Sequence, residues 1–270
     1  MKQNVEAWIY RQYDADLSLD FPGEGYTGWI RRPIPIQWEK TAVVVMHAWD
    51  VGTPEQVPAQ YRVCEYVPRS TEIIQNHFPA FLEAVRESGV KLIHVGSRTE
   101  TSLEALPGYR RTVEKYGIDP EPLPRVEPDE SWKVLQEIRA SEGFPGTHNE
   151  EGVDLSRQMR DFAILPREDE DVVATTHQMF SLCRDLGINH LIYTGFAVNA
   201  CLTMSPCGML DMSRRGVICS IVRDLTTAVE NRESCRQQRH KAYGLWAFSL
   251  WGGFVFDQKE LENALQKGHW

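Results

Sequence analysis

The stretch that decides the fold is residues 188–201, which read INHLIYTGFAVNAC. It contains a short apolar run at 191–193, which Thr194-Gly195 closes, and then a turn that ends in Cys201. A brief apolar run halted by Gly is typical of a buried parallel strand. The carboxyl ends of such strands form the edge at which open α/β proteins bind their ligands. The stretch therefore predicts an α/β sheet that carries a cysteine at its ligand-binding edge.

Two interpretations of Cys201 are open from the residues alone. The residues after it favour a helix, and the positive end of a helix dipole lowers the pKa of a cysteine and favours a nucleophilic thiolate. However, Pro206 interrupts any helix that begins at Cys201, and a helix capped by Ser205 with Pro206 at its first position agrees better with the rules for helix starts. Alternatively, the cysteine is a small buried hydrophobe, as free cysteines often are.

The rest of the chain predicts a three-layer α/β/α sandwich around a mostly parallel sheet. Residues 41–46, TAVVVM, form a continuous β-branched strand of the kind that is covered on both faces. A helix from Ser70, with Pro79 predicted to kink or split it, ends at Gly89 before a second strand at 90–95, which completes a right-handed crossover unit. Further strands are expected at 171–176, 217–222 and 253–256, and helices at 130–140, 179–186 and 233–248.

Residues 41–270 are predicted to be a single domain, and residues 1–40, rich in aromatics and proline, an extended arm on the body or on a neighbouring subunit. The net charge of −9 argues against a nucleic-acid or anionic-membrane surface. No signal-like segment begins the chain, and the longest apolar run, 243–256, is too short and too Gly-rich to span a bilayer. Six cysteines without a CxxC pair or metal-like spacing predict reduced thiols in a cytoplasmic protein.

The segment TGFAVNAC resembles the strand–turn–cysteine signature of the isochorismatase-like cysteine hydrolases, which include nicotinamidases and N-carbamoylsarcosine amidases. In that family the strand ends in Thr-Gly, a small residue lies four positions before the cysteine, and Asp or Asn lies two before it. Here Thr194-Gly195, Ala197, Asn199 and Cys201 occupy those places. The resemblance covers the chain from about Thr41 onwards. It implies the fold above, hydrolysis of a small-molecule amide or related C–N bond, and a homo-oligomer.

Two catalytic positions depart from the family's pattern. His47 stands where the family has the Asp that takes the proton of the cysteine, and Asp50 lies near a second Asp of that motif. A histidine next to a thiol also makes thiolate, so His47 is a candidate base with Asp50 to orient its ring; a histidine hydrogen-bonded at a strand end is the alternative. The strand at 171–176 lacks the family's lysine, and His177 is the nearest ionisable group.

In the mechanism that the resemblance implies, Cys201 attacks a carbonyl or imine carbon. Backbone N–H groups of Ala197 and Cys201 hold the oxyanion, each contributing about 3 kcal/mol. The family's peptide bond before the small residue, here Phe196–Ala197, is cis. The pocket is expected to use four further side chains, with Arg98 binding a carboxylate or carbonyl unless it is an ordinary surface arginine: Trp49, Arg98, His177 and Asn199.

Two functions of different classes follow. The first is a cysteine hydrolase with a Cys–His dyad, which acts on a small molecule and needs no cofactor. The second is a catalytically silent relative that serves as a small-molecule-binding protein or oligomeric scaffold. A metal at His47 and Asp50 was a weaker alternative; the Asp-x-His metal motif of the nicotinamidases is absent, so no metal is expected.

Overall fold

The computed structural model describes residues 2–97, 103–118, 126–143, 152–154 and 162–268. The predicted pocket residue Arg98 lies outside these ranges. Among the described residues, no helix has the length and apolar character that crossing a membrane requires.

The described strands form one mixed sheet with the order β2-β1-β8-β7-β6-β3-β4-β5. The strands from β8 to β5 run parallel to one another, and β1 and β2 are antiparallel additions at one side. The expected mostly parallel sheet is therefore confirmed. The strands are β1 (Lys2–Arg11), β2 (Gly28–Gln37), β3 (Thr41–Met46), β4 (Lys91–Val95), β5 (Asp171–Val173), β6 (His190–Gly195), β7 (Ile218–Thr226) and β8 (Val255–Phe256).

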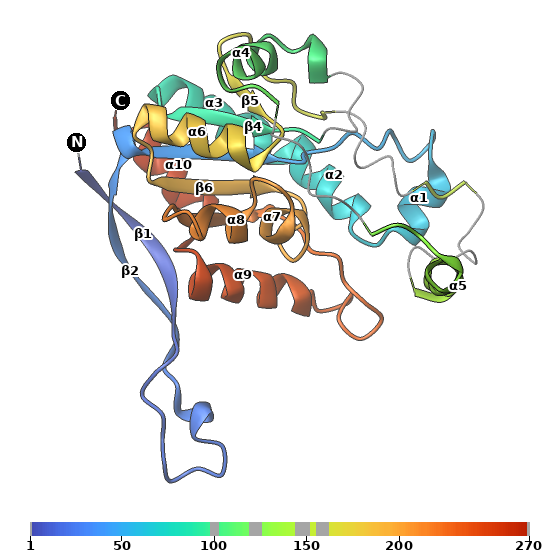
Figure 1. The fold of residues 1–270 in the computed structure, drawn as a ribbon. Helices are drawn as coiled ribbons and strands as arrows, with labels where there is room; N and C mark the ends of the chain where they lie inside the picture. Colours follow the sequence, from blue (N-terminus) through green and yellow to red (C-terminus); the bar gives the residue numbers. More distant parts are fainter. Residues whose placement is uncertain (1, 98–102, 119–125, 144–151, 155–161, 269–270) are drawn as a thin grey trace.

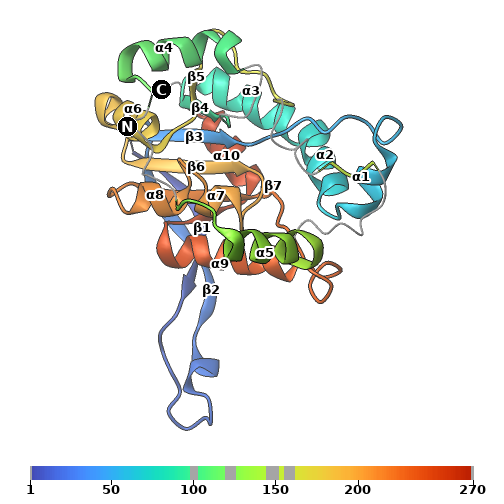
Figure 2. The same ribbon diagram turned by 45° about the vertical axis from the view of Figure 1, so that its right-hand side comes forward.

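Helices cover both faces of the sheet, as Figures 1 and 2 show. Alternate residues of β3 explain why: Val43 and Val45 belong to one buried cluster, and Val44 and Met46 to the other. The first cluster includes residues of α2 (Val67–Asn76), α3 (Phe78–Ser88) and α10 (Gln258–Leu265). The second includes residues of α6 (Thr176–Leu186), α7 (Cys201–Met204), α8 (Met209–Ser213) and α9 (Arg239–Trp251). These layers are the predicted sandwich.

The remaining helices lie outside this core. Helix α4 (Pro107–Tyr116) follows the 3-10 turn Leu103–Ala105 and contributes Tyr109 to a small cluster with β5. Helix α1 (Pro58–Val63) precedes α2, and α5 (Glu130–Ile138) continues into a π turn at Arg139–Gly143.

The predicted break at Pro79 is confirmed. Helix α2 ends at Asn76, and α3 begins at Phe78 with Pro79 in its first turn, where a missing N–H costs nothing. Gly89 ends α3 in the left-handed region, with φ of 77°. Helix α2 starts at Val67 rather than at the expected Ser70, since proline at position 68 is accepted near a helix start.

Two local expectations were wrong. Ser205 does not cap a helix that starts at Pro206: α7 runs from Cys201 to Met204, Ser205 ends it, and Gly208 precedes α8. The strand predicted at 171–176 ends at Val173, because the Thr175 hydroxyl accepts a hydrogen bond from the amide of Gln178 and caps α6 instead.

Residues 2–37 form a long β-hairpin that joins the sheet. Its strands pair from Lys2↔Gln37 to Arg11↔Gly28, and β1 bridges to β8 at Trp8↔Val255. Its base is buried, with Ala7 fully covered, whereas the blue loop between the strands projects far from the body (Figures 1 and 2).

Candidate active site

The turn that carries the cysteine begins where β6 lies closest to β3. Gly195 pairs with Met46, and the next amide, that of Phe196, donates to the Met46 carbonyl over 3.1 Å. A Cβ on Gly195 would lie 1.9 Å from this carbonyl oxygen, and its φ of +110° is in the region that favours glycine. Because of this close approach, the residue after β3, His47, and the turn after β6 leave the sheet side by side.

Hydrogen bonds to the loop after β7 hold the turn in place. The amide of Val198 donates to the Thr227 carbonyl over 2.8 Å. The Asn199 side chain donates to the Val229 carbonyl over 2.8 Å and accepts from the Val229 amide over 2.9 Å. Asn199, predicted to bind substrate, therefore uses both ends of its amide within the protein.

Cys201 lies at the end of this turn as a free, partly exposed thiol. The amides of Ala200 and Leu202 both donate to the Ala197 carbonyl over 3.1 Å. Within the described part of the chain, the amides of Ala197 and Cys201 themselves have no hydrogen-bond acceptor. The Phe196–Ala197 peptide bond is cis. The two amides that the resemblance assigns to an oxyanion are thus free to donate.

His47 is buried at the end of β3. Its backbone adopts φ of 51°, uncommon for a non-glycine residue, and its amide donates to the Val95 carbonyl over 3.3 Å. Burial lowers the pKa of its ring to about 4, so the imidazole is neutral at pH 7. Its Nδ1 is buried and has no hydrogen-bond partner among the residues that the structure describes.

Asp50 is exposed and takes part in a turn. Its Oδ1 accepts a hydrogen bond from the amide of Gly52 over 2.8 Å. Since His47 Nδ1 has no partner in the described structure, Asp50 does not provide the predicted contact to that nitrogen. The expected contact between these two residues is therefore absent, even though they are close in sequence.

Aromatic side chains surround the base of the cysteine turn. The Trp49 ring lies 5.2 Å from that of Phe196 and 6.2 Å from that of Tyr66, measured between centroids. Trp49 Nε1 is buried and lacks a described hydrogen-bond acceptor. A buried N–H without a partner is costly, and the role of Trp49 as a pocket residue stays a prediction.

Tyr66 lies near Trp49 and Cys201, a position that sequence reasoning did not predict. Burial raises the pKa of its hydroxyl, which is hydrogen-bonded to Cys64 and lies close enough to Cys201 to interact with it electrostatically. It therefore stays protonated near Cys201. Tyr66 is the residue just before α2. Proline is common in the first turn of a helix, so Pro68 could have indicated that the helix begins next to Tyr66.

The end of β5 contributes no cation. Ala174, where the resemblance expects a lysine nearby, is buried, and its amide donates to Gln178 Oε1 over 2.9 Å. His177 is exposed on α6, and its Nε2 donates to the Tyr116 carbonyl over 3.2 Å. These contacts hold the His177 ring against α4 rather than against the cysteine turn.

Thr227 adds another unsatisfied polar atom at this edge. It follows β7, whose Thr226 pairs with Gly195, and its Oγ1 is buried with no described hydrogen-bond partner. Three buried polar atoms near the carboxyl edge of the central strands therefore lack a described hydrogen-bond partner: His47 Nδ1, Trp49 Nε1 and Thr227 Oγ1. No cluster of three or more His, Cys, Asp or Glu side chains in the described ranges is arranged to hold a metal ion.

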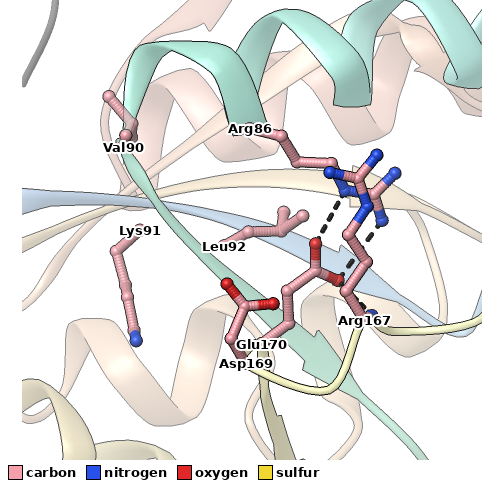
Figure 3. A pocket seen from close by; sticks show the side chains of 8 residues that line it. Arg86, Val90, Lys91, Leu92, Arg167, Asp169 and Glu170 are labelled. Carbon is pink, nitrogen blue, oxygen red and sulfur yellow. Dashed lines mark hydrogen bonds and ion pairs between the residues drawn. The ribbon is translucent and has the colours of Figure 1, made fainter.

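An open pocket of about 230 Å³ lies at the opposite, amino-terminal edge, beside β4 (Figure 3). Within it, Arg86 contacts the Glu170 carboxylate at 2.7 and 3.3 Å, and the Arg167 amide donates to it over 2.9 Å. Buried His94 binds the same carboxylate at 2.8 Å. Two further basic side chains of the pocket also form ion pairs, Lys91 with Asp171 and Arg167 with Glu83. This pocket is therefore walled by a stabilising ionic network.

Comparison with solved structures identifies the class of fold. A cysteine hydrolase from Pseudomonas syringae pv. phaseolicola matches with a TM-score of 0.51 at 13% identity, over 87% of this chain and 96% of that one. An isochorismatase-like hydrolase from Alkaliphilus metalliredigens matches with a TM-score of 0.49 at 16% identity, over 83% and 98% of the two chains. No protein-family model and no curated protein matches the sequence.

The chain thus has the fold of the isochorismatase-like cysteine hydrolases, as its sequence resemblance implies. The identity is low, so this likeness defines the fold and leaves the chemistry to the residues of the site.

Proposed function

We propose that this protein is a cysteine hydrolase that cleaves a small-molecule amide or related C–N bond through Cys201. The observation that carries the proposal is the buried His47 ring with its unpartnered Nδ1, set beside the cysteine turn by the pairing of Met46 with Gly195. A buried imidazole nitrogen without a partner is costly unless it serves binding or catalysis.

In the proposed reaction, the Cys201 sulfur attacks the carbonyl carbon as its proton passes to neutral His47. The amides of Ala197 and Cys201 hold the oxyanion that forms. The amine then leaves with the proton from His47, and a water molecule, giving a proton back to His47, hydrolyses the thioester to the acid and the free thiol. The pKa of about 4 keeps His47 unprotonated at rest, so the dyad begins as thiol and imidazole rather than as an ion pair.

The lining of the site supports an uncharged substrate. Trp49 offers an N–H donor and an aromatic face, Tyr66 a protonated hydroxyl, and Phe196 a second ring. None of the described side chains at the turn supplies the cation that a carboxylate substrate would need. The three aromatic residues thus favour a neutral, partly apolar amide, and Arg98, the predicted carboxylate ligand, lies outside the described residues. The unpaired state of all six cysteines supports a reducing compartment such as the cytoplasm.

A second candidate is the catalytically silent relative that binds a small molecule. The observation that favours it is the loss of the two charged partners: Asp50 bonds to Gly52 instead of to the His47 Nδ1, and the end of β5 carries Ala174 in place of a lysine. In this case the unpartnered donors at the sheet edge would bind a ligand without cleaving it.

Iodoacetamide labelling at pH 7, followed by peptide mass spectrometry, separates the two. Cys235, which is also partly exposed, provides an internal reference in every sample. A working dyad should label Cys201 at least about tenfold faster than Cys235, and His47→Asn should remove that advantage because the attacking sulfur loses its base. His177→Asn is the matched control and should change nothing. Equal rates at the two cysteines, insensitive to His47→Asn, would instead support the silent relative.

A further inference from the structure

The loop of the hairpin, residues 12–27, folds on itself away from the body (Figures 1 and 2). The amide of Asp16 donates to the Pro22 carbonyl over 3.1 Å, and the Thr27 hydroxyl donates to Asp14 over 2.6 Å. The outermost described contact with the body is the hydrogen bond from Trp246 Nε1 to Gln12, at 3.2 Å. The loop is therefore an ordered projection whose surface its own body does not cover.

This projection exposes apolar side chains. Leu17 is 86% exposed and Phe21 is 72% exposed, and Tyr13, Leu19 and Tyr26 are also exposed. Single exposed apolar residues need no explanation, but a group of them on one projecting element marks an interaction surface.

The same loop is strongly acidic. Between residues 12 and 27 there is no Lys or Arg, and four carboxylates are present: Asp14, Asp16, Asp20 and Glu24. No ion pair in the described part of the chain involves any of them. The loop thus carries uncompensated negative charge next to its apolar side chains.

A complementary surface lies at the start of α9. Arg232, Arg236 and Arg239 are exposed there, and in the described residues their guanidinium groups have no partner. The nearby opposite charges are Glu233 and the buried Glu230, whose carboxylate accepts from the amides of His240 and Lys241, and Tyr243, 60% exposed, follows on α9. Further along α9, a pocket of about 220 Å³ opens towards the base of the hairpin, lined by Trp8, Trp29, Arg223, Ala242, Leu245 and Val255. Positive charge here adjoins apolar surface.

We propose that the hairpin loop of one chain docks on the Arg232–Arg239 segment and the first turns of α9 in a second copy of this chain. The acidic loop and the basic segment lie apart in both views of the molecule, so they do not satisfy each other within one chain (Figures 1 and 2). In a pair related by a two-fold axis, each loop reaches the other chain's segment, and the contact is reciprocal and closed. This inference is independent of the chemistry at Cys201.

Sedimentation at micromolar concentration tests the proposal through a charge swap. The wild type should sediment at twice the 31.0-kDa chain mass. Asp20→Lys, at a residue without a described side-chain hydrogen bond, and Arg236→Glu should each place like charges together and weaken the dimer on the order of a hundredfold. The double variant, Asp20→Lys with Arg236→Glu, should regain the dimer, and added salt should weaken the wild-type dimer.

Matched controls exclude general effects of charge and hydrophobicity. Glu127→Lys changes an exposed acid on another surface and should leave the mass unchanged. Leu17→Ser should weaken the dimer, whereas Val126→Ser, at a residue that is 85% exposed elsewhere, should not. A monomeric wild type would overturn the proposal and leave the hairpin for a different partner. A dimer insensitive to Asp20→Lys, with unchanged circular dichroism, would overturn it as well.

Discussion

Buried polar groups at the two edges of the parallel sheet differ in whether they have hydrogen-bond partners. At the amino-terminal edge, Arg86 and the Arg167 amide bind the Glu170 carboxylate (Figure 3), and His94 within β4 binds it as well. At the carboxyl-terminal edge, buried atoms of His47, Trp49 and Thr227 have no partner among the described residues. His94 Nδ1 is the exception at the first edge, since it too is buried and unpartnered.

Satisfied buried groups contribute to stability, whereas unsatisfied buried groups are candidates for a role in function. A buried polar network that is satisfied stabilises one conformation, whereas buried groups that stay unsatisfied cost free energy, which binding of a ligand or use in a reaction can offset. In this molecule, the charged pocket beside β4 is therefore a weaker indication of an active site than the buried, unpartnered polar atoms at the carboxyl ends of the central strands.

The largest expected effect comes from breaking the satisfied edge. Glu170→Gln leaves the Arg86 guanidinium without its carboxylate in a buried site, and we expect a loss of about 3–5 kcal/mol in the free energy of unfolding, measured by urea denaturation. Glu83→Gln, which removes the exposed partner of Arg167, should cost less than about 1 kcal/mol. Similar costs for both variants would contradict the structural role of the network.

The same variant gives a pH test. Hydrogen bonds from His94 and Arg86 lower the pKa of Glu170 below its usual value of 4.5, against the opposing effect of burial. A lowered folded-state pKa contributes stability that is complete above about pH 4.5 and is lost as the pH falls further. The difference in free energy of unfolding between the wild type and Glu170→Gln should therefore shrink as the pH falls below about 4.5, which urea denaturation at a series of pH values measures.

A smaller effect is expected where the functional edge is built. Gly195→Ala forces a Cβ against the Met46 carbonyl and should cost on the order of 3 kcal/mol. Gly216→Ala is the matched control: its φ is +84°, but nothing lies within 4 Å of an added Cβ, so only about 1 kcal/mol of backbone strain is expected. Gly195→Ala should also slow Cys201 labelling if it moves the turn. Equal losses of stability would show that the close approach to Met46 is not the constraint.

The smallest expected effects are two changes of opposite sign in the free energy of unfolding, at two buried threonines. Thr227→Val removes a buried hydroxyl without a described partner and should raise the free energy of unfolding by up to about 1 kcal/mol. Thr194→Val removes a buried hydroxyl that donates to the Val44 carbonyl over 2.8 Å, so it should lower that free energy by about 1 kcal/mol. Thermal denaturation of both variants checks this. A loss at Thr227 equal to that at Thr194 would mean that its hydroxyl is already satisfied.

The fold could be predicted from sequence because its signals are local. The run at 41–46 became β3 with the expected bounds, and the break at Pro79 separates α2 from α3 as proline chemistry requires. The helix after Cys201 was misplaced because Ser205 and Pro206 satisfy a capping rule that the packing of this turn overrides.

The candidate site was less predictable, because its contacts join distant segments. Sequence could place His47 and Cys201 at one edge of the sheet, since both follow parallel strands. It could not show that Asn199 would pair with Val229, or that Tyr66 would lie near the thiol. Asp50 illustrates the limit: its spacing from His47 suggested a contact, but a nearer backbone amide, that of Gly52, takes its carboxylate.

The composition of the edge strand β2 disfavours association of two copies of this protein through backbone hydrogen bonds between their sheets. This strand is the last of its sheet, and it carries Pro33 and Pro35, which have no N–H to offer, next to Arg31 and Arg32. At the far side, the outermost strand β5 spans only Asp171–Val173. These features disfavour growth of the sheet by strand addition at both margins. The long, exposed hairpin therefore has a poor template for an added strand at its outer edge, which favours association through side chains, as in the proposed dimer.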